Sequence, residues 1–516
     1  MSSDASTFPL RTPPLLGDAS GVGRQQTSED EQARAATRRA VALGTLALLS
    51  IVLGCALIVV VAADRPTFPP THAHFFPAWL AGPLGGVWPG FPRGTDPVRY
   101  LFTFSLLVMY LGYLLGLRFV PRLPLRLVIA AIVGVHVLLL LAPPLALTDI
   151  FNYVNYGRME VVHHLNPYTS TPIVEPHNDP SFDLSNWHHL LSPYGPTFTL
   201  ITFAVVPLGV AASFWALKLI LMAASLGTIL LVWKCARLLG REPIQAIVFV
   251  GLNPVVLIWG LGGDHNDFIM MFLVVLGFYL LLLARARGAD GPAEGPAPAG
   301  VSGWRFGPLW LDLAAGAAFV TAATVKASGV VLLPIVLAGL IYSPRRLLRT
   351  TGGMVAAGAL LAVMSVIAFG LHLPDLSTQS RLVTTLSPSN LLGLAVGSGG
   401  ATAGLLHLLS GVLALSVLAA CIVAWRKRDS ITPAGWASIA LLMTLSWVLP
   451  WYVLWVLPMA ALSRSRALRS VSLVFGVFFV LAWAPLASST LGSLGFHPER
   501  TSLGRLHQRY VKELLN

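Results

Sequence analysis

Charged residues are scarce in this 516-residue chain: only 11% of its residues are Asp, Glu, Lys or Arg. A soluble protein carries about 25%, so the chain falls outside the soluble classes. Cysteine is scarce as well, and Cys55, Cys235 and Cys421 all lie within or at the edge of apolar runs. Such positions predict buried core residues and argue against a disulfide framework or a zinc site.

Long apolar runs are abundant, since 55% of the residues are hydrophobic. A transmembrane helix needs about 20 predominantly apolar residues, and helices satisfy their own backbone hydrogen bonds in lipid. We therefore predict an all-α polytopic membrane protein with about 13 transmembrane helices. The predicted spans are 41–63, 100–117, 125–147, 213–233, 244–262, 266–284, 308–325, 328–343, 351–371, 402–424, 433–449, 451–463 and 470–489.

The chain has a formal net charge of +12, and the positions of its basic residues explain this excess. With a cytoplasmic N-terminus, 23 of the 34 Lys and Arg residues fall in the inner connections, as the positive-inside rule requires. The basic excess therefore indicates membrane topology and contact with membrane lipids, and no nucleic-acid partner. We predict a multi-pass plasma-membrane protein in which residues 1–40 form a disordered cytoplasmic tail.

The predicted outer face receives residues 148–212 and the C-terminal tail 491–516. Counting 196–212 as another span would place five basic clusters outside, so we predict a short interfacial helix there. Residues 286–306, rich in Pro, Gly and Ala, predict a flexible cytoplasmic loop within the transmembrane domain 41–490. No phosphate-binding loop is visible. Any chemistry must therefore come from the outer connections and helix ends.

The stretch LTDIFNYVNYGR (147–158) places polar side chains directly after an apolar run. In a helix, Asp149, Tyr153 and Tyr156 share one face. The tyrosines alone fit an interfacial aromatic belt. A carboxylate at the mouth of a span is costly unless it is paired or used, so Asp149 is a candidate functional residue. Tyr168 and Tyr194 follow in the proline-containing turns of the same loop.

A second polar stretch, GLGGDHNDF (260–268), breaks the apolar sequence between two spans. Asp264, His265, Asn266 and Asp267 present four polar side chains in succession at a helix N-terminus. Capping by Asp264 or Asn266 would account for only one of them. The group therefore favours a functional role.

Three basic residues are candidates for holding a phosphate: Lys326 in VKAS, Arg158 and Arg381. Lys326 fits equally well as a lysine that reaches toward the membrane interface. Trp451 and Tyr452, in LPWYVLW, are suited to stacking on a sugar or an isoprenoid, and equally to an aromatic belt.

Taken in order, the motifs TDIFNYVNYGRMEVVHHLNPY, SPYGP, GGDHND, VKAS and PWYVLW resemble a known family. They are similar to the polyprenol-phosphate-mannose-dependent alpha-1,6-mannosyltransferases of actinobacterial envelopes, in the glycosyltransferase C superfamily. The resemblance extends over about 41–490. Two positions depart from the family pattern, because Asp149 is followed by Ile150 and not by a second acid, and Asp264 separates the glycines from His265.

The resemblance implies a glycosyltransferase C type fold, a polyprenyl-phosphate-sugar donor and an acceptor such as the glycolipid lipomannan or a related glycan. It also implies an active site on the outer face, with Asp149 as the catalytic base. Glycosyl transfer needs a base for the acceptor hydroxyl and donors for the leaving phosphate. The expected phosphate-binding residues are Lys326, Arg158, His265 and Arg381. The expected substrate-binding residues are Tyr153, Tyr156, Tyr168, Tyr194, Asp264, Asn266, Asp267, Trp451 and Tyr452.

An inverting displacement needs one carboxylate, and we expect neither a metal nor another cofactor. The alternatives are a transporter or flippase, a transferase for another sugar, and a noncatalytic lipid-binding scaffold. Transporters usually place ionisable groups near the membrane midplane, often in repeated halves. The candidate groups instead cluster at one face without an internal repeat. We therefore predict a membrane mannosyltransferase or related hexosyltransferase.

Overall fold

The computed structural model describes residues 19–63, 77–92, 94–145, 149–288 and 307–515, and every regular element in these ranges is a helix. The α-helices are α1 (Ala19–Ala63), α2 (Ala78–Ala81), α3 (Thr95–Phe119), α4 (Leu125–Leu141), α5 (Asp149–His163), α6 (Pro196–Val205), α7 (Val210–Leu238), α8 (Pro243–Gly251), α9 (Asp267–Ala286), α10 (Pro308–Val325), α11 (Leu332–Gly339), α12 (Pro344–Phe369), α13 (Leu376–Ser380), α14 (Pro388–Ala395), α15 (Ala403–Lys427), α16 (Ile431–Thr444), α17 (Leu457–Leu462), α18 (Arg466–Trp483), α19 (Ala487–Ser493) and α20 (Ser502–Leu515). The 3-10 segments are η1 (Gly82–Leu84), η2 (Val120–Arg122), η3 (Pro172–Val174), η4 (Val206–Leu208), η6 (Ala327–Val331), η7 (Pro450–Trp455) and η8 (Pro498–Arg500), and η5 (Val256–Leu261) is π-helical.

Eight helices in the described ranges are long and apolar enough to cross a membrane, which confirms the prediction of an all-α polytopic membrane protein. They are Glu31–Ala63, Thr95–Arg122, Val210–Leu238, Asp267–Ala286, Pro308–Val325, Pro344–Phe369, Ala403–Lys427 and Arg466–Trp483. The remaining five predicted spans coincide with shorter or interrupted helices, namely α4, α8 with η5, η6 with α11, α16, and η7 with α17. The total of 13 spans therefore stays a prediction.

The helices differ in how much of their surface the protein itself covers. In α9, 78% of the most apolar window is buried, whereas α12 and α15 bury only 22% and 17%. Apolar side chains such as Ile367 of α12 and Leu415 of α15 are therefore exposed on the sides of the helix bundle. A soluble monomer rarely exposes contiguous apolar faces of this kind, so these faces are suited to lipid, with α9 near the centre of the bundle.

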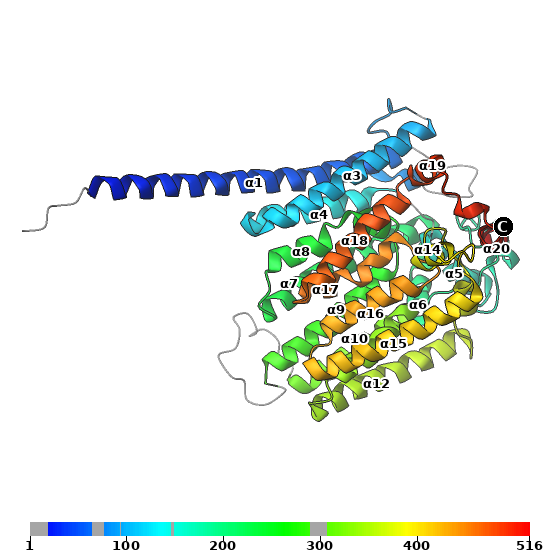
Figure 1. Ribbon diagram of the computed structural model, residues 1–516. Coiled ribbons are helices and arrows are strands. Elements are labelled where there is room, and N and C mark those ends of the chain that lie inside the picture. The colour runs from blue at the N-terminus through cyan, green and yellow to red at the C-terminus, as the bar shows by residue number, and fades with distance from the viewer. Residues whose placement is uncertain (1–18, 64–76, 93, 146–148, 289–306, 516) are drawn as a thin grey trace, which may run out of the picture.

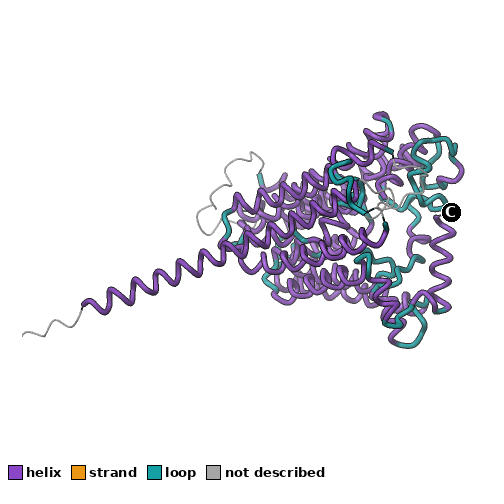
Figure 2. The backbone as a smooth tube through the Cα atoms, turned by 90° about the horizontal axis from the view of Figure 1, so that it is seen from above, coloured by secondary structure: helices purple, strands orange, loops and turns teal. Residues whose placement is uncertain are grey.

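The two ends of the bundle differ in structure (Figures 1 and 2). At one end lie α5, α14, α20 and most of the non-helical connections, and we call it the loop end. The opposite end, where α9 ends at Ala286 and α15 at Lys427, is called the far end. The C-terminal helix α20 is fixed at the loop end, because the His189 N–H donates to the carbonyl oxygen of Leu514 at 3.1 Å.

Two predicted segments are only partly described. Residues 1–18 and 289–306 lie outside the described residues, so the predicted loop 286–306 is described only to Gly288. Helix α1 begins at Ala19, so residues 19–40, expected to be a disordered tail, instead continue the first helix. Its Ala, Arg, Glu and Gln residues are strong helix formers. The predicted interfacial segment 196–212 holds α6 and η4, which together span Pro196–Leu208 and are too short for an ordinary span.

Candidate active site

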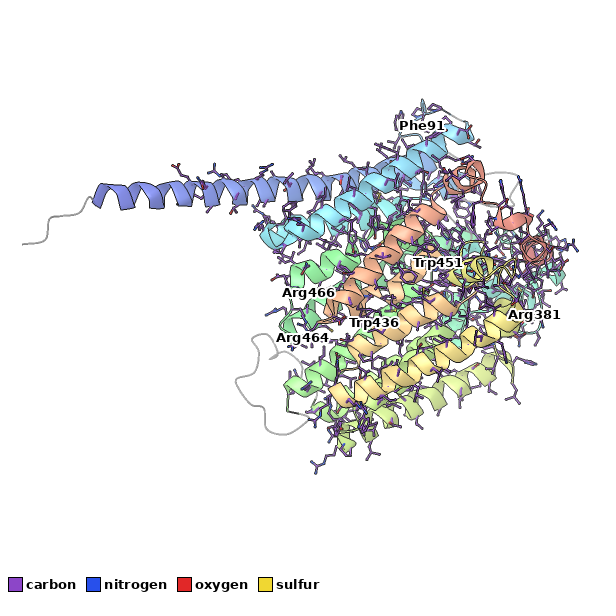
Figure 3. The ribbon with its side chains drawn as sticks, viewed as in Figure 1. Phe91, Arg381, Trp436, Trp451, Arg464 and Arg466 are labelled. Atoms are coloured by element: carbon purple, nitrogen blue, oxygen red, sulfur yellow. The ribbon has the colours of Figure 1, made fainter. Side chains whose placement is uncertain are left out.

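Polar residues from three separate segments meet at the loop end. Asp149 begins α5, residues 262–266 precede α9, and Trp451 belongs to η7 (Figure 3). His265 Nδ1 lies 3.1 Å from Asp149 Oδ2. The ring of His265 stacks on that of Trp451, with centroids 3.5 Å apart and planes within 7°. The structure thus brings together three of the motifs singled out in the sequence.

The GGDHND motif forms a sharp break between two helices. It follows the π-helical segment η5, and π segments are frequent at functional sites. Gly263 is needed because a Cβ there would lie 2.3 Å from Trp259 O and 2.5 Å from His265 Nε2. Asp264 then adopts a left-handed φ of 57°, which is uncommon for a residue other than glycine. Immediately after this break, His265 contacts Asp149.

A buried lysine of α7, Lys218, holds the Asp264 side chain. Lys218 Nζ lies 3.4 Å from Asp264 Oδ2 and donates a 2.6 Å hydrogen bond to the carbonyl oxygen of Ala142. The two side chains are 0% and 2% exposed, so each charge depends on the other for compensation. The sequence analysis missed Lys218. The sequence could have indicated it, because Lys218 is a lone lysine within the apolar run of α7, where ionisable residues are costly and often functional.

Asp267, the first residue of α9, is fully buried and accepts three hydrogen bonds. Lys326 Nζ donates to Oδ2 at 2.7 Å, Trp451 Nε1 donates to Oδ2 at 3.2 Å, and Trp455 Nε1 donates to Oδ1 at 2.6 Å. The ammonium of Lys326 also lies 4.8 Å from the centre of the Tyr452 ring, within the range of a cation–π interaction. Lys326, Trp451 and Tyr452 therefore meet around Asp267, and Trp455 is an additional member that the sequence analysis did not single out.

Asp149 is the most accessible of the three carboxylates in this cluster. Its side chain is 19% exposed, compared with 2% for Asp264 and 0% for Asp267. A general base must come within hydrogen-bonding distance of the proton that it removes, and burial prevents the other two from doing so. Lys326 is also 19% exposed, so the cluster offers an accessible carboxylate and an accessible cation.

Several buried polar atoms next to Asp149 have no hydrogen-bond partner among the described residues. They are His265 Nε2 and both side-chain polar atoms of Asn266. Asn266 occupies the N-cap position of α9, but its side chain makes no capping hydrogen bond. Unpaired buried polar atoms are rare in proteins and call for a functional or structural explanation. Here they provide donors and acceptors that the described protein does not use.

Of the four predicted tyrosines, Tyr153, Tyr156 and Tyr194 lie near Asp149 and Tyr168 lies behind Tyr194, and the described protein uses three of their hydroxyls. The Tyr153 hydroxyl accepts from Asn266 N–H at 3.3 Å, Tyr156 donates to a loop carbonyl at 2.8 Å, and Tyr168 donates to the carbonyl oxygen of Tyr194 at 2.8 Å. The rings of Tyr153 and Tyr194 pack edge to face at 4.7 Å. Tyr153, Tyr156 and Tyr168 are buried and Tyr194 is half-buried. The contacts of Tyr153 and Tyr156 fix α5 in place behind Asp149.

Arg158 is bound to the loop that follows α5. Its Nε and Nη2 donate to the two carboxylate oxygens of Asp179 at 2.9 and 2.7 Å, and His163 Nε2 lies 2.7 Å from Asp179 Oδ2. Burial alone would favour the protonated acid, but the hydrogen bonds from Arg158, from the backbone and hydroxyl of Ser181 and from His163 hold the pKa of Asp179 well below its usual range. Arg158, expected to hold a phosphate, is thus engaged in this loop. Arg381 is exposed at the end of α13 (Figure 3).

The same loop contains a buried acid with the opposite shift. Asn155 of α5 donates a hydrogen bond to Glu175 Oε1, and Glu175 is only 3% exposed. Burial raises the pKa of Glu175 to about 7, with a smaller contribution in the same direction from nearby Asp179. We therefore expect the contact between α5 and its loop to depend on pH near neutrality.

The SPYGP turn joins this loop to the segment that bears Lys326. Gly195 N–H donates to the carbonyl oxygen of Val325 at 3.2 Å. A Cβ on Gly195 would lie 2.0 Å from the carbonyl oxygen of Thr324. The absence of a side chain thus lets the start of α6 pack directly against the end of α10, next to Lys326.

The fold and this charged cluster define a polytopic membrane protein with a candidate active site at one end of its bundle. The sequence profile of the family described as "Alpha-(1->6)-mannopyranosyltransferase, N-terminal domain" matches residues 39–342. The "Probable alpha-(1->6)-mannopyranosyltransferase" of Mycolicibacterium smegmatis is 28% identical, over 66% of each chain. Two alpha-(1->6)-mannopyranosyltransferases of Mycobacterium tuberculosis are 26% identical over 68% of each chain, and 27% identical over 70% of this chain and 69% of the relative. No solved structure matches the chain.

The chain belongs to the alpha-(1->6)-mannopyranosyltransferase family and is a glycosyltransferase. This confirms the resemblance inferred from the motifs. The aligned part spans about two thirds of the length of these relatives. The matched range 39–342 includes Asp149, the GGDHND motif and Lys326, whereas Arg381, Trp451 and Tyr452 lie beyond it.

Proposed function

We propose that the protein transfers mannose from a polyprenyl-phosphate donor to a glycolipid or glycan acceptor at the outer face of the plasma membrane. The names of the relatives support mannose as the sugar. Basic residues at the far end, including Arg285, Lys427 and Arg464, support a cytoplasmic far end. The loop end, with Asp149, then faces outward, where lipid-linked sugars are accessible from the membrane.

In the proposed reaction, Asp149 takes the proton of the acceptor hydroxyl while the acceptor oxygen attacks the anomeric carbon of the donor sugar. The bond from that carbon to the phosphate oxygen breaks, and the leaving phosphate keeps the electron pair. One displacement with one carboxylate inverts the anomeric configuration, and this step requires no metal. The observation that carries the proposal is the accessibility of Asp149 within a cluster whose other two carboxylates are buried.

The neighbours of Asp149 have supporting roles in this proposal. His265 Nδ1–H donates to Asp149 Oδ2 and orients the carboxylate, and its stacking on Trp451 fixes the imidazole ring. Lys326 holds the leaving phosphate while it remains paired with Asp267, because an ammonium has three donors and Asp267 occupies one of them. Both effects act on charge that develops during the transfer.

The test uses membranes that contain the full-length protein, radiolabelled polyprenyl-phosphate-mannose and a short α-1,6-linked mannan acceptor. Loss of a general base costs about 10²–10⁴ in rate, so we expect Asp149→Asn to lose transfer by at least about 100-fold while donor binding is kept. The matched control is Asp183→Asn, which changes an exposed aspartate of the same outer loop and should retain full activity.

Two outcomes would overturn parts of this proposal. If Asp149→Asn transfers at the wild-type rate, Asp149 is not the base. If the wild-type protein binds the donor but transfers mannose to no glycan or glycolipid acceptor, the sugar or the acceptor is wrong. The other sugars and a lipid-translocation assay then become the next measurements.

A further inference from the structure

A large cavity opens at the far end of the bundle, away from the candidate active site. Its volume is about 1700 Å³, and Arg285, near the C-terminal end of α9, lines it. Asp267, at the other end of α9, belongs to the candidate active site. At 1.5 Å per residue the two sites lie roughly 30 Å apart along this helix, about the thickness of the hydrocarbon core. Figure 3 shows Arg464 and Trp436 on the side of the bundle away from Arg381.

The rim of the cavity is strongly basic. Its described lining includes one acidic residue, Asp429, and six basic residues: Arg241, Arg285, Arg346, Lys427, Arg428 and Arg464. Arg346 is neutralised by Asp312, with Nη2 and Oδ1 3.1 Å apart, and Arg428 packs over the ring of Tyr342 at 4.5 Å. Lys427 and Arg464 are exposed. Even without Arg285 and Arg346, the four other basic residues outnumber Asp429, so the rim has a positive excess.

The basic residues of the rim repel one another. Burial and the nearby positive charges of Arg464 and Arg469 lower the pKa of Arg241, and Asp429 only partly offsets them. Like charges held close together are unfavourable unless an anion compensates them. The cluster is thus complementary to a negatively charged group.

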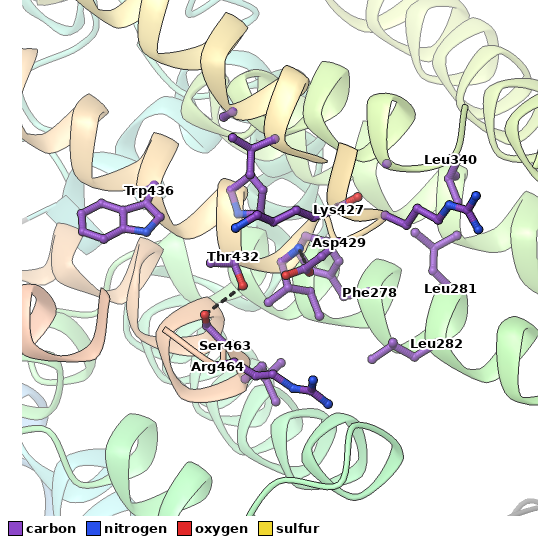
Figure 4. Close-up of a pocket in the computed structure, with 18 of the residues that line it drawn as sticks. Phe278, Leu281, Leu282, Leu340, Lys427, Asp429, Thr432, Trp436, Ser463 and Arg464 are labelled. Carbon is purple, nitrogen blue, oxygen red and sulfur yellow. Dashed lines mark hydrogen bonds between the residues drawn. The ribbon is translucent and has the colours of Figure 1, made fainter. Parts of the chain in front are cut away.

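The inner part of the cavity is apolar (Figure 4). Phe278, Leu281 and Leu282 of α9 form one wall, and Leu340, directly after α11, and Trp436 of α16 also line the cavity. The lining extends along α15 from Ser416 to Lys427, which is roughly 16 Å at 1.5 Å per residue. This depth is about half of the hydrocarbon core, or one leaflet. The cavity therefore combines a basic rim with an apolar interior whose depth is similar to that of one leaflet of the membrane.

We propose that this cavity binds one anionic phospholipid from the leaflet at the far end. The phosphate headgroup contacts Lys427 and Arg464, and a hydrocarbon chain lies along Phe278 and Leu281. Inorganic phosphate would make no contact with the apolar wall, and a zwitterionic lipid has no net negative charge to compensate the positive charge of the rim. The site lies at the opposite end of α9 from Asp149, so this lipid is neither the proposed donor nor the proposed acceptor.

The test is native mass spectrometry of the full-length protein in detergent, with phosphatidylglycerol, phosphatidylcholine of the same chains, or inorganic phosphate. Each basic residue near the membrane surface contributes about 1 kcal/mol, or about fivefold, to anionic-lipid affinity. We expect Lys427→Gln/Arg464→Gln to weaken phosphatidylglycerol binding at least about tenfold and to abolish its advantage over phosphatidylcholine. The matched control is Arg466→Gln, an exposed arginine two residues from Arg464 that does not line the cavity. It should keep the wild-type preference.

A second variant tests the apolar part. Ala419 lines the cavity and is exposed, so Ala419→Trp should fill the interior and weaken lipid binding without changing the rim. Thermal unfolding without added lipid shows that each variant is folded. Equal binding of the two lipids by the wild-type protein would overturn the proposal. So would inorganic phosphate that displaces phosphatidylglycerol at comparable concentration, or an unchanged preference in the Lys427→Gln/Arg464→Gln variant.

Discussion

The buried pair of Lys218 and Asp264 offers a sharp test of how the candidate active site is held together. Replacing Lys218 by methionine keeps a side chain of similar length but leaves the Asp264 carboxylate uncompensated. The variant also removes the 2.6 Å hydrogen bond from Lys218 Nζ to the carbonyl oxygen of Ala142. Breaking a buried ion pair by removing one partner costs about 3–5 kcal/mol. We expect Lys218→Met to lower the free energy of unfolding by this amount.

The same change should also lower transfer activity. Asp264 has a left-handed backbone, which costs about 1–3 kcal/mol and persists only when the surroundings enforce it. Without Lys218, relaxation of Asp264 would displace the adjacent His265 from its 3.1 Å contact with Asp149. The proposed base would then lose its orientation, so the catalytic rate should fall more than the affinity for the donor.

The free energy of unfolding can be measured by SDS titration of the protein in mixed micelles, and transfer by the radiolabelled assay. The matched control is Lys234→Met in the same helix, whose side chain is half-buried and lies over the Tyr279 ring at 5.6 Å. It should cost no more than about 1 kcal/mol. The double variant Lys218→Met/Asp264→Asn should be more stable than the sum of the single effects predicts, because it removes both charges. Additive effects, or a Lys218→Met variant as stable as the wild type, would refute the pairing.

Three further predictions concern the loop end. Glu175 has a pKa of about 7 in the folded protein, above its ordinary 4.5. Between these pH values the folded protein binds more protons than the unfolded chain, so the free energy of unfolding should fall as the pH rises from 4.5 through 7. Glu175→Gln should flatten that part of a plot of melting temperature against pH. Arg158→Gln breaks the two-pronged contact with buried Asp179 and should lower the free energy of unfolding by about 3–5 kcal/mol, with little change in the donor KM of the protein that remains folded. Gly195→Ala places a Cβ against the end of α10 and should cost about 1–3 kcal/mol of stability, with reduced transfer because Lys326 follows directly.

Each of these predictions has an outcome that would contradict it. A Glu175→Gln protein with the wild-type pH profile would locate the titrating group elsewhere. A stable Arg158→Gln protein with a strongly raised donor KM would instead restore Arg158 as a phosphate ligand. For Gly195→Ala the control is Gly404→Ala, since that position in α15 has open space around it. Equal stability of the two alanine variants would show that the turn tolerates a side chain.

The sequence singled out residues whose chemistry conflicted with their surroundings, and the structure brings two of these groups together. Asp149 at the mouth of a span and four polar residues after two glycines are both costly in a membrane protein, and the structure places one of the four, His265, 3.1 Å from Asp149. Arg158 and the tyrosines carried no such conflict. Their partners, such as Asp179 for Arg158, lie in a loop whose course no local pattern specifies.

The sequence by itself determined that the chain is a helical membrane protein, because apolar runs of this length are stable only in lipid. Its motifs also determined the family and located the polar segments at helix ends. Only the tertiary structure decided which carboxylate is accessible, since Asp264 and Asp267 are buried by Lys218, Lys326 and the tryptophans of η7. Burial and charge pairing depend on contacts between segments far apart in the chain, and the packing of the helices sets those contacts.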